Sequence, residues 1–591
     1  MVRRRADGHP AFRGVCVCLH SICRLASASD ERSPQDVSAE GILAELKLKH
    51  PNHAALQAFE PERADVEPED DVSDDISEDA SDEAPDERAE MEEAFMLSSR
   101  RMVIDAMRLC NNDATLTELE FDESALGDDG ASNLALALRQ NTVLTSLDVR
   151  STGICRDGGI AIMNALSVNK TLVSLSIGNN NLHAACKDPE VLSLSENTSL
   201  KSLDLTAARI DAEGAARMAE MLRRSSIETF CIRVNTIGDE GTVAIAGMLA
   251  VNSTLRTLDL DKVGMTAVGM TALGEALSKN TTLRTLHLSG NKIGDEGSAA
   301  LGDALKKNTS LNRLIMYSMG FGQGLKHITL ALGSSATISS IDLSNNKLGD
   351  SGFDLLVAAL RANSSIESID LTDNDIGDYG ISQLVNALMQ KPVKRLILDE
   401  NDIHHLGVSQ ITRLLRPGAS KLRMLSLSRN HVGEDGAAML DEALRTNTTL
   451  EVLDLVDNHI GDAGAVSMAK TLAVNGSMTE LMLDDNDINR EGAVAIFKAL
   501  RVNGKLQRID MPENHIGNGG AAELAAMIGV NKTLVCLNIF KAGFGVAGAR
   551  AIADAVCGSA TVTSCSISSL KFTKAKRAEL RAAVGDRIRF V

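Results

Sequence analysis

The chain has 591 residues and a formal net charge of −20, from 80 acidic and 60 basic residues. Hydrophobic residues make up 44% of it but aromatic residues only 2%, so its core must be built from uniform layers of aliphatic side chains. The negative balance argues against a nucleic-acid partner, which requires a cationic surface. No apolar run approaches the ~18 residues that a membrane-spanning helix needs.

The first hundred residues differ in composition from the rest. Residues 1–35 combine arginines with a short apolar stretch, so we expect a disordered leader, with a targeting segment as the alternative. Apolar spacing predicts a short helical segment over 36–59. Residues 60–93 hold 18 acidic side chains and two arginines, which is −16 of the total −20, and predict a disordered acidic linker. Residues 94–115 match the helix half of a repeat and predict a capping helix.

From residue 116 onward one pattern recurs without interruption. It starts 17 times between Leu116 and Val562, and of the 16 spacings twelve are 28 residues, three are 27 and one is 29. A period of this length is the signature of a repeat architecture. We therefore predict repeats over 116–561, followed by a degenerate last repeat and a basic C-terminal cap over 562–591.

Each repeat has three parts. The segment LxxLxL predicts a short strand with the leucines inward. A motif of the form IGDxG follows, in which glycine supplies the turn and aspartate starts the next helix. The ninth position is Asn in ten repeats, and we expect these amides to form a ladder that satisfies buried backbone groups. They are Asn180, Asn235, Asn291, Asn346, Asn374, Asn401, Asn430, Asn458, Asn486 and Asn514.

Stacking determines the architecture, because one repeat cannot bury its own apolar face. Parallel strands lie ~4.8 Å apart whereas helices are ~10 Å wide, so the stack must curve with its strands inside. We predict an α/β fold, a right-handed solenoid or horseshoe with a parallel sheet on the concave face and helices on the convex face.

The segments LRTLDLDKVGMTAVG and LEVLDLVDNHIGDAG resemble leucine-rich repeats of the ribonuclease-inhibitor type. The resemblance covers roughly residues 100–590 and extends to the repeat regions of NOD-like receptors, Ran GTPase-activating proteins and some ciliary or regulatory proteins. It implies a scaffold that binds a protein.

Two groups of residues on the concave face are candidates for binding that protein. Ile315 and Tyr317 are apolar and aromatic residues in the most irregular repeat, where such residues favour binding. An acidic stripe in the later repeats indicates a partner with a basic surface, although a solvated sheet face is polar in any case. The stripe comprises Asp370, Asp373, Asp399, Glu400, Asp454, Asp457, Asp484, Asp485, Asp510 and Glu513.

The remaining polar patterns have architectural explanations. His431, His459 and His515 recur at the tenth position, and we interpret them as exposed turn residues, since a metal would need further ligands. Nine N-x-S/T sequons fall where a helix ends and the next strand begins, so the repeat itself accounts for them. The sequence contains no nucleotide-binding loop, zinc-protease motif or nucleophile elbow, and we expect no catalytic residue, cofactor or metal.

These observations predict a non-catalytic interaction scaffold that is monomeric and cytoplasmic, with the nucleus or cilium as alternative locations. Two other functions remain open. One is GTPase activation of the Ran-activator type, and the other is a structural role in a ciliary or cytoskeletal assembly.

Overall fold

The fourth residue of each repeat lies at the middle of a short strand and points into the core, as Leu147 and Leu453 do. The computed structural model describes residues 105, 108–121, 126–189, 191, 194, 197–567 and 587–590. The chain divides into two compact units, which we call unit 1 (1–265) and unit 2 (266–591). In both units strands and helices alternate along the chain.

Unit 1 contains six described strands and five described helices. The strands are β1 (Glu118–Glu120), β2 (Ser146–Asp148), β3 (Ser174–Ser176), β4 (Ser202–Asp204), β5 (Thr229–Cys231) and β6 (Thr257–Asp259). The helices are α6 (Gly127–Gln140), α7 (Arg156–Val168), α8 (His183–Lys187), α9 (Ala212–Leu222) and α10 (Gly238–Leu249).

Unit 2 continues the same alternation. Its strands are β7 (Thr285–His287), β8 (Arg313–Ile315), β9 (Ser340–Asp342), β10 (Ser368–Asp370), β11 (Arg395–Ile397), β12 (Met424–Ser426), β13 (Val452–Asp454), β14 (Glu480–Met482), β15 (Arg508–Asp510), β16 (Cys536–Asn538), β17 (Ser564–Ile567) and β18 (Ile588–Phe590). Its helices are α11 (Ala267–Leu277), α12 (Gly294–Lys307), the short 3-10 helix η2 (Gly322–Gly324), α13 (Leu325–Ser334), α14 (Gly349–Ala362), α15 (Asp378–Leu388), α16 (His405–Leu415), α17 (Gly433–Leu444), α18 (Gly461–Leu472), α19 (Arg490–Leu500), α20 (Gly517–Ile528) and α21 (Val546–Gly558).

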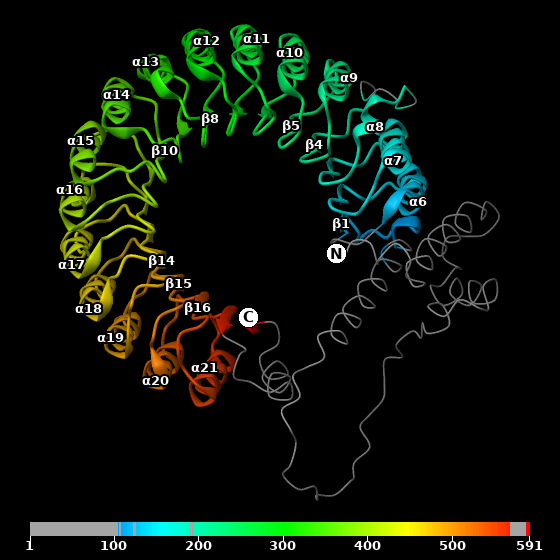
Figure 1. Ribbon diagram of the computed structural model, residues 1–591. Coiled ribbons are helices and arrows are strands. Elements are labelled where there is room, and N and C mark those ends of the chain that lie inside the picture. The colour runs from blue at the N-terminus through cyan, green and yellow to red at the C-terminus, as the bar shows by residue number, and fades with distance from the viewer. Residues whose placement is uncertain are drawn as a thin grey trace, which may run out of the picture. The chain divides into compact units, whose positions relative to one another are not determined.

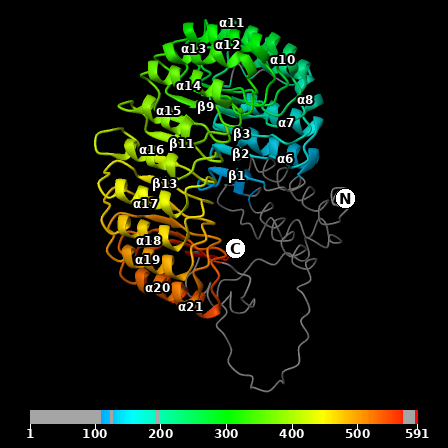
Figure 2. The same ribbon diagram turned by 60° about the vertical axis from the view of Figure 1, so that its left-hand side comes forward.

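Every strand pair within a unit is parallel and joins equivalent positions of successive repeats. In unit 2, for example, Ile369 of β10 lies opposite Ile341 of β9 and Leu396 of β11. Within each unit the strands line the inner, concave side and the helices cover the outer side (Figures 1 and 2). The predicted fold class, a leucine-rich-repeat α/β solenoid, is confirmed.

The predicted asparagine ladder is present. Asn486 is buried, and its Nδ2 donates to the carbonyl of Leu455 in the preceding repeat at 2.7 Å and to that of Asp484 in its own repeat at 3.0 Å. Its Oδ1 accepts from the backbone N–H of Asn458 at 3.1 Å and of Ile460 at 3.3 Å. One amide therefore satisfies four backbone groups and joins two repeats.

The asparagines of the sequons form a second ladder on the other side of the helices. Asn475 is buried, and its Nδ2 donates to the Leu444 carbonyl at the end of α17 at 2.7 Å. Its Oδ1 accepts from the N–H groups of Ser477 and Met478 at 3.0 and 2.8 Å. Because the amide is buried and fully bonded, the repeat explains the sequon without glycosylation.

Changes in repeat length coincide with the loss of this second asparagine. The four repeats of 27 or 29 residues have Ser225, Ser335, Lys391 and Ser420 in the region where the others carry Asn. The strands on either side still pair in register, as Leu396 does with Leu425. The helix-to-strand loops therefore absorb insertions and deletions, and the concave rows stay aligned.

The IGDxG turn works differently from the sequence prediction. Gly461 has a φ of 61°, and a Cβ on Gly464 would lie 3.0 Å from that of Ala437, so both glycines are needed. The prediction that the aspartate starts its own helix is wrong at Asp462. Its Oδ1 accepts from the N–H groups of Asn489 and Gly492 at 2.9 and 2.8 Å, and so caps α19 of the next repeat.

The two ends of the repeat stack are only partly described. The predicted leader, helical segment and acidic linker (1–93) lie outside the described residues, as does most of the capping helix over 94–115. Leu109 is buried, and its carbonyl accepts from Asn141 Nδ2 at 2.8 Å.

At the other end, β18 pairs with β17, a strand that the repeat pattern did not predict. Arg587 lies just before β18 and donates to the carbonyls of Cys557 and Ser559 at the end of α21, at 3.3 and 3.1 Å. One basic residue of the predicted C-terminal cap thus covers a helix terminus.

We expect Asn486→Ala to lower the free energy of unfolding of the repeat stack by about 2–4 kcal/mol, because four buried backbone groups lose their partner. Urea denaturation of the full chain measures this change. Asn489→Ala is the matched control, because Asn489 is exposed and donates only to the Asp487 carbonyl. Equal effects of the two substitutions would contradict the role of the ladder.

Candidate functional site

The twelve residues predicted from sequence all lie in unit 2, between β8 and the turn after β15. Ile315 ends β8 and lies opposite Asp342 of β9. Tyr317 is exposed, and its hydroxyl accepts from Asn345 Nδ2 at 3.1 Å. The acidic residues occupy the strands and turns that follow, so the strand register joins both predicted groups into one surface.

The fifth positions of successive repeats form a row along the concave face. Strand pairing aligns Ile315, Asp342, Asp370, Ile397, Ser426, Asp454, Met482 and Asp510. Where this row carries Ile397 or Met482, the residue two positions later is an aspartate, Asp399 or Asp484. Carboxylates thus continue along the face but shift from the fifth to the seventh position.

The aspartates of the fifth position are anchored to their own strand ends. Asp370 Oδ1 accepts from the Thr372 N–H at 3.1 Å and from the Thr372 hydroxyl at 2.7 Å. Burial raises the pKa of Asp370 above its ordinary value, against the effect of these hydrogen bonds. Burial likewise raises the pKa of Asp454, whose Oδ1 accepts from the Val456 N–H at 3.1 Å.

Asp399 is held by the next repeat. Its Oδ1 accepts from the Ser426 hydroxyl at 2.5 Å and from the Ser428 N–H at 2.9 Å. Burial, with added repulsion from Asp454 and Asp370, nevertheless raises the pKa of Asp399 to about 6.

Asp484 is the least compensated carboxylate among the described residues of this face. Burial, followed by repulsion from Asp510 and Asp454, raises its pKa to about 7. Its Oδ1 is buried and accepts no hydrogen bond from any described residue. The register explains this, because the equivalent positions in the neighbouring repeats are Val456 and Pro512, which have no side-chain donor.

The eighth-position acids stand at the turn that leaves the strand. They share a left-handed backbone conformation, with φ between 49° and 55°. Two of them already have partners, since Glu400 pairs with Arg429 at 2.5 Å and Glu513 with Lys541 at 2.9 Å. The others are Asp373, Asp457 and Asp485.

Asp510 differs from the other fifth-position aspartates. It is buried and pairs with Arg508 of its own strand at 2.8 Å. The predicted stripe therefore separates into paired acids and a less compensated set, Asp370, Asp399, Asp454 and Asp484. The strand pattern predicted the stripe, but the buried oxygen of Asp484 depends on side chains of both neighbouring repeats.

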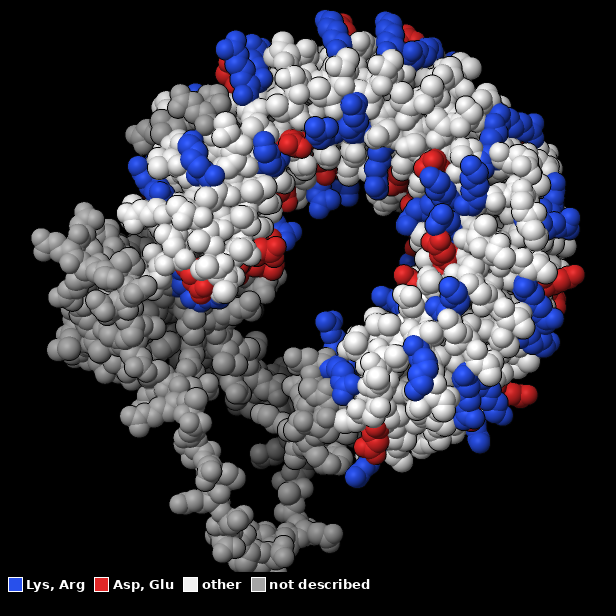
Figure 3. Space-filling model, turned by 180° about the vertical axis from the view of Figure 1, so that it is seen from behind, with Lys and Arg blue, Asp and Glu red and all other residues white. Residues whose placement is uncertain are grey.

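Charge also differs along the helices of unit 2. Their first turns carry acids, such as Asp295 and Glu434, and their last turns carry bases, such as Lys307 and Arg361. This arrangement complements the helix dipole. In Figure 3, Lys and Arg predominate over the helix layer of the visible face, whereas both signs meet along the strand side. The concave acids are thus a separate feature from the acidic helix starts.

Unit 1 has a hollow on its own concave face that the sequence did not predict. It has a volume of about 350 Å³ and is lined in part by Glu120, Asp148, Arg150 and Arg233. Gly178 also lines it, and a Cβ there would lie 2.5 Å from the Thr206 carbonyl oxygen. Arg150 pairs with Asp148 at 2.5 Å, so this carboxylate is already compensated, unlike Asp484 in unit 2.

Comparisons with known proteins agree with the fold. Seven segments match a family model described as a leucine-rich repeat, at residues 140–163, 196–219, 279–302, 334–357, 362–385, 446–469 and 474–497. The chain thus carries leucine-rich repeats in both units. No curated protein matches the chain.

Two solved structures are similar in part. One is a chain in the crystal structure of the Rad7 and Elc1 complex in yeast, at 13% identity and a TM-score of 0.41, covering 61% of this chain and 82% of that one. The other is leiomodin-1 actin-binding site 2, at 18% identity and a TM-score of 0.21, covering 25% and 88%. Among the described residues, no helix has the length and apolar character to cross a membrane.

We expect Asp484→Asn to stabilise the protein at pH 8 and to change little at pH 4. The folded-state pKa is raised, so the folded protein holds a proton that the unfolded chain releases, and stability falls as the pH rises from about 4 through 7. Because the side chain is partly exposed, the gain at pH 8 is only about 1 kcal/mol.

Urea denaturation at both pH values measures the effect. Asp485→Asn serves as the control, because Asp485 is the exposed next residue. A gain at pH 8 no larger than that of Asp485→Asn would show that the Asp484 carboxylate carries no burial cost.

Proposed function

We propose that this chain is a non-catalytic scaffold that binds a protein through the concave strand face of unit 2, and that the partner presents arginine or lysine side chains. The observation that carries the proposal is the buried, unbonded Oδ1 of Asp484 on this face. A guanidinium or ammonium group would supply the missing donor and offset the repulsion among the carboxylates.

The spacing of the carboxylates supports a macromolecular partner. Asp454, Asp484 and Asp510 come from three successive strands, β13 to β15, and Asp399 from the turn after β11. Strands lie ~4.8 Å apart, so these groups extend well beyond the reach of one small cation. A protein surface with several basic side chains can contact them together, and its charge would mainly raise the association rate and the selectivity.

The raised pKa values of Asp399 and Asp484, about 6 and about 7, give the proposed binding a pH dependence. A cationic partner binds the ionised carboxylates, so its affinity should rise between pH 6 and pH 8, and binding near pH 6.5 should release protons. A partner held by apolar contacts alone would show neither effect.

The test is affinity capture with the full chain, identification of partners by mass spectrometry, and binding measurements on the purified partner. The double substitution Asp399→Asn and Asp484→Asn removes two charges with little change in shape, and we expect the affinity to fall about 10- to 100-fold. The matched control removes two exposed acids at helix starts, Glu296→Gln and Asp350→Asn, and should bind like the unaltered chain.

Two outcomes would overturn the proposal. Equal binding by the double variant and the control would place the interaction elsewhere on the molecule. Stimulation of GTP hydrolysis in a panel of small GTPases, at sub-stoichiometric amounts of this chain, would favour the GTPase-activator alternative.

A further inference from the structure

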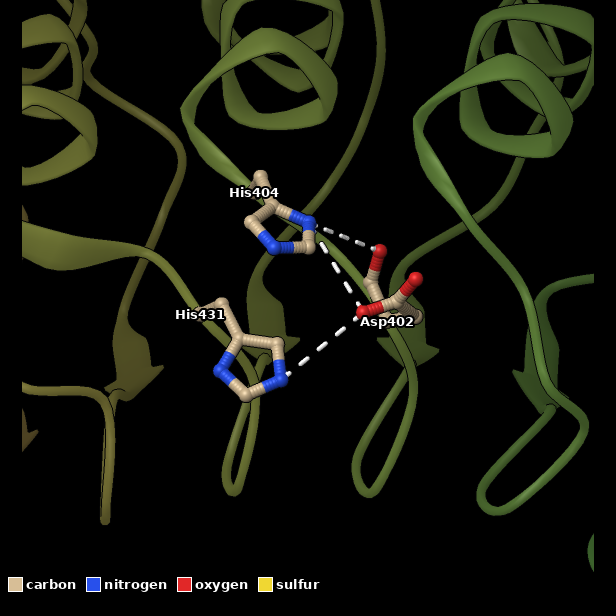
Figure 4. Close-up of side chains that lie close together, drawn as sticks. All are labelled: Asp402, His404 and His431. Atoms are coloured by element: carbon tan, nitrogen blue, oxygen red, sulfur yellow. Dashed lines mark hydrogen bonds and ion pairs between the residues drawn. The ribbon is translucent and has the colours of Figure 1, made fainter.

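A cluster of metal-ligating side chains lies in unit 2, on the turns that follow β11 and β12. Asp402 and His404 belong to one turn and His431 to the next (Figure 4). His404 and His431 face each other across an isolated parallel bridge, and the His431 N–H donates to the Ile403 carbonyl at 2.9 Å. The backbone therefore holds the two imidazoles side by side, with ring centroids 4.9 Å apart.

The ligand atoms of the three side chains converge. Asp402 Oδ1 lies 3.8 Å from His404 Nδ1 and 3.7 Å from His431 Nε2. All three ligand atoms lie within 4.8 Å of one another. Tetrahedral zinc with bonds of ~2.1 Å needs ligand atoms about 3.4 Å apart, so the required closing movement is small.

The position of His404 is fixed from behind. Its N–H donates to Asp378 Oδ1 of the preceding repeat at 2.9 Å, and α16 begins at the following residue. All three side chains are exposed, so rotation about their own bonds is enough to close the site. His404 Nδ1 also lies 3.3 Å from the Asp402 carbonyl oxygen, a contact that it would exchange for the metal.

Ordinary hydrogen bonding does not account for the cluster. The Asp402–imidazole distances of 3.7 and 3.8 Å exceed the hydrogen-bond range. One repeat further along, His459 Nδ1 lies 2.9 Å from Asp487 Oδ2, which is a simple hydrogen-bonded pair of one imidazole with one carboxylate. At Asp402, two imidazoles share one carboxylate.

We propose that Asp402, His404 and His431 form a binding site for a divalent transition-metal ion of the zinc class. The ligands would be Nδ1 of His404, Nε2 of His431 and the carboxylate of Asp402. Two imidazole nitrogens with one carboxylate suit zinc, nickel or copper, whereas calcium and magnesium prefer oxygen ligands.

Such an ion would clip two successive repeats together at the edge of the concave face. Three protein ligands leave a fourth position open to water or to a side chain of another molecule. This inference is independent of the proposed protein partner, because it uses none of the carboxylates assigned to that surface.

The test is a calorimetric titration of the full chain with zinc chloride alone. We expect His404→Ala and His431→Ala each to lose one binding equivalent, or to weaken that binding at least about tenfold, relative to the unaltered chain. His515→Ala is the matched control, because His515 holds the same turn position as His431 and lies outside the cluster. The affinity should also fall on acidification, since protons compete for the imidazole nitrogens.

A second readout guards against damage to the fold. Zinc should raise the thermal unfolding midpoint of the unaltered chain and of His515→Ala by more than that of His431→Gln, and circular dichroism checks that each variant is folded. Unchanged zinc stoichiometry and affinity in both His404→Ala and His431→Ala would overturn the proposal, whatever zinc binds elsewhere on the chain.

Discussion

The fold depends on satisfying backbone groups that are buried between successive coils. At the end of each strand the chain turns within the core, where an unpaired N–H or C=O costs about 1–3 kcal/mol. One asparagine, such as Asn486, bonds to four such groups and joins its own repeat to the one before it. Because this amide reaches across the interface, it fixes the position of each strand relative to its neighbour. The regular period of the sequence is the result of that requirement.

Fixed register has a chemical consequence for the concave face. Equivalent positions lie side by side, so an aspartate that recurs in the repeat faces other aspartates on neighbouring strands. Asp370, Asp399 and Asp454 meet this cost with hydrogen bonds from hydroxyl or backbone donors. Asp484 has neither neighbour with a side-chain donor, and one of its oxygens is left without a bond. A stacked fold that tolerates such a cost leaves a surface whose electrostatics a cation would improve.

The sequence predicted those features that one repeat determines. The strand positions, the inward leucines and the asparagine ladder all follow from the period and from side-chain chemistry. Features that depend on two repeats were missed or mistaken. Asp462 caps α19 instead of its own helix, because the turn directs its carboxylate toward the following repeat. Strand β18 was missed because its sequence lacks the LxxLxL pattern.

The same distinction explains the histidine cluster. His431, His459 and His515 share one position, and sequence reasoning treats them alike. Their surroundings differ because the preceding or following turn supplies different partners, namely Asp402 and His404 for His431 but Asp487 for His459. His404 and His431 are 27 residues apart although their repeat has 29, because the insertion lies after α16, in the loop that contains Gly418. Length variation on the helix side thus leaves the turn side aligned. New combinations of ligands can therefore arise between repeats without a change in the fold.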